Sequence, residues 1–242
     1  MKRIIAPLAL LATFLLCSVA AAAPREGADG DVLGRPLGLV VALAMVSLLP
    51  FAFMSVTAFV KVSTVLQISK SALGAQSVPS NMVVMALAAS LTVLAMMPTA
   101  DKIVARAAPL VAEEKVETLA FLQGGFEAVR EPLREFLSKH ASPKEKARFV
   151  SVIERQRGQA SATDLSVLVP AFLVTELTEA FAIGFLIYLP FLVIEIVVTN
   201  VLLALGMQML NPTQVSLPFK LLLFVAVDGW GLLAQALVDS YR

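Results

Sequence analysis

Two long apolar blocks, separated by a charged segment, dominate this chain. Residues 37–60, in the first block, carry no charge, and in the second block the forty residues between Glu179 and Lys220 contain only one charged residue, Glu195. Either stretch is long enough to cross a hydrocarbon layer of about 30 Å as a helix, which requires about 20 residues. The pattern predicts an all-α protein whose apolar blocks form membrane-associated helical hairpins.

Prolines interrupt both blocks at positions that a plain membrane anchor would avoid. A proline removes one backbone donor and clashes with the preceding turn, and in lipid only a neighbouring helix can satisfy the freed carbonyl. We therefore expect helix breaks or bends, packed against other helices, at Pro50, Pro190, Pro212 and Pro218.

The first block is predicted to form a hairpin. Residues 61–70 contain two lysines, Lys61 and Lys70, and no acid, so they are expected to begin the connection to a second helix at residues 82–97. Because basic residues favour the cytoplasmic side of a membrane, this connection is expected in the cytoplasm and the segment after Pro98 in the periplasm.

The second block is predicted to hold two long helices joined by a turn at residues 211–212. The second of these helices is expected to run from about residue 216 to residue 238, with Asp228 inside it. Such a carboxylate marks either a functional position or a residue at the membrane interface, and the sequence leaves both open.

The segment between the blocks is predicted to be a small helical extramembrane insert. Residues 101–164 hold 11 of the 19 lysines and arginines and 10 of the 18 acids. Ser142 followed by Pro143 is typical of a helix start, and Gly124, Gly125 and Pro132 are expected to divide the preceding helix. Apolar residues at mostly three- and four-residue steps indicate one apolar helix face there: Leu119, Leu122, Phe126, Val129, Leu133, Phe136 and Leu137.

The amino terminus has the pattern of a cleavable signal peptide. Basic residues at positions 2 and 3 precede an apolar run at 4–16 and a small-residue stretch that ends at Ala23, with cleavage expected near Ala22. The alternative is a first transmembrane helix. We divide the chain into residues 1–22 (signal), 23–98 (leader and first hairpin), 99–165 (insert) and 166–242 (second hairpin). The mature chain would lose Cys17, its only cysteine, so disulfide and thiolate chemistry are excluded.

Composition supports membrane residence and excludes several functions. Hydrophobic residues make up 58% of the chain, the mean hydropathy is +0.84 and charged residues make up 15%, against roughly 25% in ordinary soluble domains. The net charge of +1 gives no basic field for nucleic acid. Phosphate-binding loops, zincin helices and nucleophile elbows are missing from the sequence, and His140 is the only histidine. We expect no enzyme, no cofactor and no metal, with His140 at the surface or capping a helix.

Charged residues in the second block are predicted to be buried against protein instead of lipid. A carboxylate near the bilayer centre costs about 3 kcal/mol even on insertion scales. Glu195 is expected to pair with Lys220, because both lie at the edges of one hairpin. The full set expected to be buried or to serve assembly is Glu176, Glu179, Glu195, Lys220 and Asp228.

Three sequence motifs follow one another along the chain. They are LLPFAFMSVTAFVKVSTVLQISKSALGAQSVPSNMV at 48–83, EPLREFLSKH at 131–140 and VPAFLVTELTEAFAIGFLIYLPFLVIEIVVTNVLLALGMQMLNPTQVSLPFKLLLFVAVDGW at 169–230. Together they cover about half of the mature chain. In this order they resemble the FliP/SctR family of inner-membrane export-apparatus proteins of flagella and type III secretion injectisomes.

The resemblance implies a subunit of the export gate that passes unfolded proteins across the inner membrane. Such subunits assemble in about five copies, with smaller hydrophobic export-apparatus subunits, into a helical ring that meets needle or rod base proteins. Their hairpins are largely lifted out of the bilayer and pack on one another. A methionine-rich loop acts as a gasket around the pore, and its matching positions here are Gly206, Met207, Gln208, Met209 and Leu210. Without the resemblance, two methionines at i and i+2 would be read as core filler.

This chain departs from the common family form at two positions. Gln208 stands where many relatives have a third methionine, and Glu195 stands where aspartate is usual. An amide prefers water or a hydrogen bond, which makes the seal chemically less uniform. The sequence LLALGMQMLNP at 202–212, followed by SLPFK at 216–220, favours the injectisome over the flagellar branch, and hence bacterial virulence over flagellum biogenesis. The rival hypothesis is a small-solute or ion transporter with Glu195 as its proton or cation site.

Overall fold

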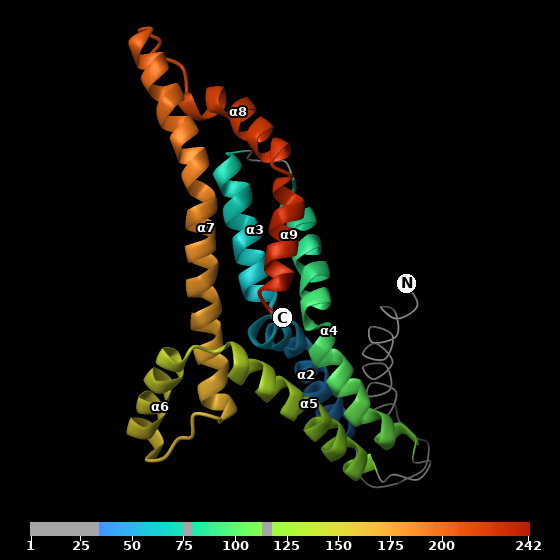
Figure 1. Cartoon of the computed structure of the whole chain (residues 1–242). Coiled ribbons are helices and arrows are strands. Elements are labelled where there is room, and N and C mark those ends of the chain that lie inside the picture. The colour runs from blue at the N-terminus through green and yellow to red at the C-terminus, as the bar shows by residue number, and fades with distance from the viewer. Residues whose placement is uncertain (1–33, 75–78, 113–117) are drawn as a thin grey trace. The chain divides into compact units, whose positions relative to one another are not determined.

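The structure is a computed structural model that describes residues 34–74, 79–112 and 118–242 (Figure 1). The expected signal peptide and Cys17 lie outside these residues. Within them the chain forms helices and no strand, which confirms the all-α prediction. The helices are α2 (Gly34–Val56), α3 (Phe59–Leu73), α4 (Asn81–Ala112), α5 (Thr118–His140), α6 (Pro143–Arg157), α7 (Leu165–Ala204), α8 (Pro212–Ala226) and α9 (Gly229–Asp239).

Two compact units are formed. One contains the described residues of Met1–Met54 and Pro98–Pro132, and the other contains those of Ser55–Met97 and Leu133–Arg242. The expected gasket residues 206–210 and the charged residues Glu176, Glu179, Glu195, Lys220 and Asp228 all lie in the second unit. The candidate site is therefore described in that unit.

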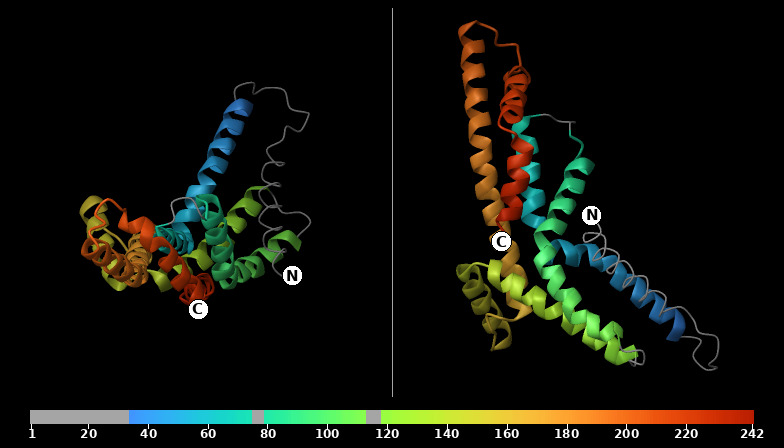
Figure 2. Two further views of the ribbon diagram at one scale, coloured as in Figure 1. Left: turned by 90° about the horizontal axis from the view of Figure 1, so that it is seen from above. Right: turned by 45° about the vertical axis from the view of Figure 1, so that its right-hand side comes forward.

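The second unit is organised around α7 and α3. These helices run side by side with α9 in both views of the chain (Figures 1 and 2), and α3 makes the most extensive packing with α7. At the closest approach a Cβ added to Gly184 would lie 2.6 Å from Cδ1 of Ile68, so only glycine fits there.

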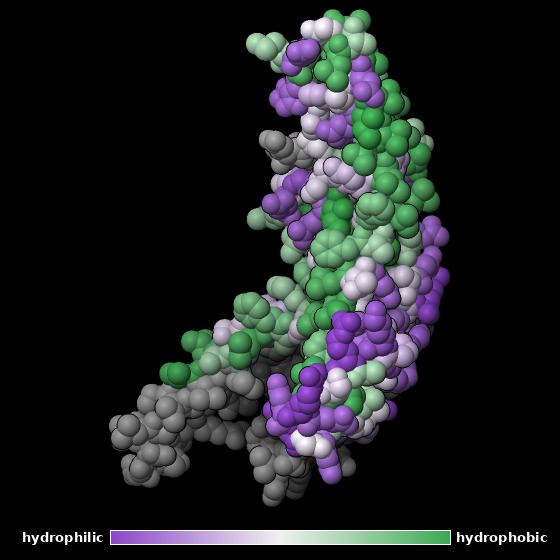
Figure 3. Space-filling model, turned by 90° about the vertical axis from the view of Figure 1, so that its left-hand side faces the viewer, coloured by the Kyte–Doolittle hydropathy of each residue, from purple (hydrophilic) through white to green (hydrophobic). Residues whose placement is uncertain are grey.

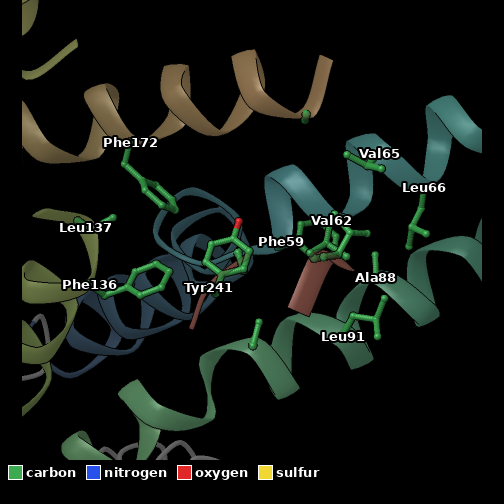
Figure 4. Close-up of a cluster of buried hydrophobic side chains, with 14 of the residues drawn as sticks. Phe59, Val62, Val65, Leu66, Ala88, Leu91, Phe136, Leu137, Phe172 and Tyr241 are labelled. Carbon is green, nitrogen blue, oxygen red and sulfur yellow. The ribbon is translucent and has the colours of Figure 1, made fainter. Parts of the chain in front are cut away.

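A continuous apolar core joins α3, α4, α5 and α7 in this unit. Figure 4 shows it from Phe172 on α7 and Phe136 on α5 to Val62 and Leu66 on α3 and Ala88 on α4. Phe172, Val62 and Leu66 are fully buried. Each such side chain contributes about 1.5–3 kcal/mol through burial, which fixes the faces that α3 and α7 present to each other.

Three of the four prolines that were expected to break or bend helices do not break them. Pro50 lies inside α2, Pro190 inside α7 and Pro218 inside α8, and each helix continues past its proline. A proline costs about 3 kcal/mol in a helix interior, whereas ending an apolar helix would leave several backbone groups without partners. Pro212 differs from the other three, since it is the first residue of α8.

Two other boundaries also differ from the expectation. Residues 61–70 lie inside helix α3 and not in a connection, which instead follows Gly74, a left-handed residue with φ 75°. The expected helix at 216–238 begins at Pro212 and is broken at Val227–Asp228, where α8 and α9 meet at 57°.

The insert was also predicted to contain a break in its first helix, and the structure has no break there. Helix α5 is continuous through Gly124, Gly125 and Pro132, because the apolar periodicity along it outweighs these weak helix formers. The expected start of α6 is confirmed. The Ser142 hydroxyl accepts a hydrogen bond from the Glu145 amide at 3.2 Å, and Pro143 follows it in the first turn.

Length and composition allow α4 (over Asn81–Pro109) and α7 to span a membrane, and up to four spans result if each of two bent helix pairs counts as one. In the most apolar stretch of α7 only 11% of the residues are buried within the chain. Figure 3 shows a band of apolar side chains on one face of the molecule, with hydrophilic ones along its edges and over the lower part of the view. A helix that leaves so many large apolar side chains exposed is typical of a surface that lipid or other protein covers.

Candidate functional site

The connection between α7 and α8 is an exposed loop at one end of the second unit (Figure 1). It begins where Gly206 adopts φ 74°, which lets the Gly206 amide bond the Leu203 carbonyl at 3.0 Å and the Met207 amide bond the Leu202 carbonyl at 2.9 Å. Glycine favours this left-handed helix ending because it has no Cβ. The loop ends at Asn211, whose side chain accepts from the Thr213 amide at 3.0 Å and caps α8.

All the expected gasket residues lie on this loop, and we call residues 206–210 the methionine loop. Met209 is 100% exposed and Met207 is 45% exposed, and Gln208 and Leu210 are also exposed. Large apolar side chains without cover are unfavourable in water. Flexible, polarizable thioethers adapt to partners of irregular shape. The loop is therefore a surface that needs a partner beyond the described residues.

An ion pair fastens α7 to α8 near this loop. Lys220 Nζ lies 2.5 Å from Glu195 Oε2, and the Thr213 hydroxyl donates to Glu195 Oε1 at 2.7 Å. Lys220 is buried, so its charge depends on this partner. Removal of one member of a buried pair typically costs about 3–5 kcal/mol. The expected pairing of Glu195 with Lys220 therefore occurs within one chain, and we call this group the α7–α8 clasp.

A second charged group lies deep in the unit. Lys61 Nζ on α3 lies 3.3 Å from Glu176 Oε1 and 2.6 Å from Glu179 Oε2, both on α7. The Tyr241 hydroxyl donates to Glu176 Oε2, and the Lys61 ammonium lies 4.6 Å from the centroid of the Tyr241 ring. The side chains of Lys61 and Glu176 are 3% and 1% exposed. This charged cluster joins α3, α7 and the carboxyl-terminal residues.

Sequence reasoning missed Lys61 as a member of this cluster. It placed Lys61 in a connection near the cytoplasm, whereas packing of α3 on α7 buries it. A signal was present, because Glu176 and Glu179 are three residues apart and therefore share one face of α7. Two acids on one apolar helix face predict a cation opposite them.

His140 packs beside this cluster instead of lying at the surface. Its ring centroid is 4.7 Å from that of Phe136 and 5.1 Å from that of Tyr241. Burial, together with the charges of Lys139 and Lys61, lowers the pKa of His140 to about 4, against a smaller opposing effect of Glu179. The imidazole is therefore neutral at neutral pH. Burial also raises the pKa of the Tyr241 hydroxyl, which remains a donor to Glu176.

Two of the acids predicted to be buried are exposed within a single chain. Asp228 is exposed at the junction of α8 and α9, and the Glu179 side chain is 51% exposed beside Lys61. Over the described residues, no group of three or more His, Cys, Asp or Glu side chains could hold a metal ion.

Comparison with known proteins identifies similar chains. Residues 42–237 match a model described as the FliP family. The chain is 42% identical over 209 residues to the hypersensitivity response secretion protein HrcR of Ralstonia nicotianae, over 84% of this chain and 96% of that protein. It is 41% identical over 214 residues to the Yop proteins translocation protein R of Yersinia pestis, with 85% and 96% covered. It is 36% identical over 217 residues to the flagellar biosynthetic protein FliP of Bacillus subtilis, with 89% and 96% covered. The methionine loop, the α7–α8 clasp and Lys61 lie within the matched residues, and Tyr241 lies beyond them.

Proposed function

Because the chain belongs to the FliP family, we propose that it is a core subunit of a type III secretion export gate in the bacterial inner membrane. With partner subunits it forms the channel through which unfolded proteins leave the cytoplasm. The similar proteins are named for secretion, for translocation and for flagellar biosynthesis, which supports a role in protein export.

The observation that carries this proposal is the exposed methionine loop. Met207 and Met209 occupy a reversal between two apolar helices, and nothing else among the described residues covers Met209. Thioether side chains at the mouth of a conduit would deform around varied polypeptides and then close again. Gln208 adds one hydrogen-bonding group to this seal.

Assembly into a homo-oligomer follows from the uncovered surface of α7. Most of this helix is exposed and apolar, yet it also carries the half-exposed Glu179, which is costly in lipid. Neighbouring copies, about five by family resemblance, and small hydrophobic export subunits would cover it. Needle or rod base proteins and the exported polypeptides complete the set of partners. Multi-pass insertion with residues 99–165 in the periplasm remains part of this proposal.

Function would then reside in shape, sealing and assembly, and not in bond chemistry. We propose that the chain is not an enzyme and binds no cofactor, since its buried charged groups Lys61, Glu176 and Lys220 are used in ion pairs between helices.

The seal is tested by replacing both loop methionines with alanine. Met207→Ala/Met209→Ala should raise leakage of ions and small molecules through the assembled gate more than it lowers protein export. Met82→Ala is the matched control, because Met82 is 82% exposed and lies on α4 away from the loop. Unchanged leakage in the double variant would count against the gasket.

Assembly is tested by purification in mild detergent. A large ring-like particle that contains small hydrophobic subunits supports the gate. A monomer or dimer with ion-dependent solute flux would support the transporter instead.

A further inference from the structure

The break between α8 and α9 holds a residue in an unfavourable backbone conformation. Asp228 has φ 51° and ψ 50°, and over residues 34–74, 79–112 and 118–242 it is the one non-glycine residue with positive φ. The left-handed conformation crowds Cβ against the following carbonyl in every L-residue, although aspartate tolerates it better than most. Persistence of such a residue requires that its surroundings hold it there.

Contacts on both sides of Asp228 hold the bend. The Phe224 ring covers Gly229, where an added Cβ would lie 2.3 Å from the ring, and it meets Trp230 edge to face at 5.1 Å. The Asp228 carboxylate lies over Gly231, where an added Cβ would be 2.3 Å from Oδ2. A carboxylate at the start of α9 is also favoured by the helix dipole. The bend thus depends on two glycines and one aromatic pair.

The two arms of the bend differ in how firmly they are held. Helix α9 is anchored in the core by Leu237 and, just after it, by Tyr241. Helix α8 buries only Ser216, Lys220 and Phe224. Its outer face is exposed, with Phe219, Leu222 and Val225 all more than half accessible.

The far end of α8 is held by polar contacts, which are the bonds of Glu195 to Lys220 and Thr213 in the α7–α8 clasp. Thr213 and Leu217 also lie close to Gly74 at the end of α3. Hydrogen bonds and ion pairs are lost over short displacements, because they weaken steeply with distance and angle. The methionine loop is attached directly to this end of α8.

We propose that α8 is a swinging arm that turns about Asp228 when the α7–α8 clasp opens and carries the methionine loop with it. In the second state Asp228 takes helical dihedral angles, and α8 and α9 approach one continuous helix. The proposal rests on the proposed role of the loop as a seal, and it adds the element that moves it.

Two substitutions at one position should give different ratios of the bent to the straight state. Asp228→Gly and Asp228→Ala both lose the carboxylate contact at α9. Glycine adopts the left-handed conformation without a Cβ penalty and keeps the bend, whereas alanine favours a straight helix. Glycine is preferred over alanine in a left-handed position by about ten-fold, so the ratio of bent to straight should differ between the variants by about that factor.

Spin labels at Gln214 on α8 and Asp239 on α9 measure the change. With 1.5 Å per residue and the observed 57° bend, the labelled positions are about 33 Å apart, and a straight helix places them about 37 Å apart. Double electron–electron resonance is recorded on the assembled complex, with Cys17 replaced by serine and the labelled chain diluted with unlabelled chain. Asp228→Ala should enrich the longer distance and Asp228→Gly the shorter one.

A variant of the α7–α8 clasp provides an independent test of the proposal. Lys220→Met opens the clasp without changing the hinge and should enrich the longer distance as Asp228→Ala does. Asp228→Ala should also leak more ions than Asp228→Gly. Equal distance distributions in the alanine and glycine variants would overturn the hinge, and shifted distances with equal leakage would overturn its link to the loop. If the methionine loop is not a seal, leakage is unchanged in Met207→Ala/Met209→Ala. Failure of the seal proposal and failure of the hinge proposal are therefore distinguishable.

Discussion

Removal of the Lys61 charge should destabilise the second unit strongly. Lys61→Met keeps a similar length of apolar side chain but leaves Glu176, whose side chain is 1% exposed, with only the Tyr241 hydroxyl as a partner. Breaking a buried pair in this way costs about 3–5 kcal/mol, since the remaining carboxylate is neither solvated nor neutralised. For a chain of this size that cost lowers Tm by about 6–20 °C.

The assay uses the single tryptophan of the chain. Trp230 reports unfolding by its fluorescence, and all variants are heated at one scan rate in the same detergent, because irreversible unfolding makes Tm depend on the rate. Lys70→Met is the matched control. It lies on the same helix, and its amine donates to Asn81 Oδ1 at 2.7 Å near the surface, so its loss should cost less than about 1 kcal/mol.

A second substitution tests the cause of the loss. Glu176→Gln in the Lys61→Met background removes the unpaired charge and should recover part of the stability, which gives a favourable coupling between the two positions. Equal Tm values for Lys61→Met and Lys70→Met, or strictly additive effects of Lys61→Met and Glu176→Gln, would refute the buried-charge reasoning.

Three further changes test other contacts. The pKa of His140 is lowered to about 4 in the folded chain, against the ordinary histidine value of 6.5, so the unfolded chain takes up a proton first as the pH falls. Its contribution to stability is therefore present above pH 6.5 and is lost between about pH 6.5 and pH 4. The Tm of His140→Phe should depend less on pH over that range, and parallel curves would contradict the assignment. Gly184→Ala should destabilise by about 1–3 kcal/mol through its clash with Ile68, and Ile68→Ala should relieve the clash, as chemical denaturation can measure. Glu195→Gln should impair assembly and export because Lys220 stays buried without its counter-charge, and wild-type assembly and secretion would rule out a required charge there.

Several local features were predictable because they depend on residues that are near each other in the sequence. Ser142 and Pro143 begin α6, and Asn211 and Pro212 begin α8, as capping chemistry predicts. The position of the methionine loop follows from the same signal, since it directly precedes that cap. The pairing of Glu195 with Lys220 could be predicted because both residues belong to one hairpin.

Other features were not predictable from local rules. Proline lowers helix stability wherever it occurs, but whether a helix bends, ends or continues depends on the packing around it, and α7 continues through Pro190. The true break in the second hairpin lies at Asp228, where the Phe224 ring and the close approach at Gly229 favour a bend. Aspartate tolerates the left-handed conformation better than most residues, but this weak preference does not by itself mark Asp228, because contacts with its surroundings stabilise the conformation there.

The sequence by itself determined the helical class, the extent of the apolar blocks and the family, because block length, capping residues and motif order are properties of the chain alone. Only the tertiary structure decided which charges meet. Lys61 pairs with acids on α7, and Tyr241 bonds Glu176 across a separation of 65 residues, because the packed faces of α3, α7 and α9 bring them together. Pairing of this kind depends on distances of a few ångströms, and those are set by packing between helices and not by the order of residues along the chain.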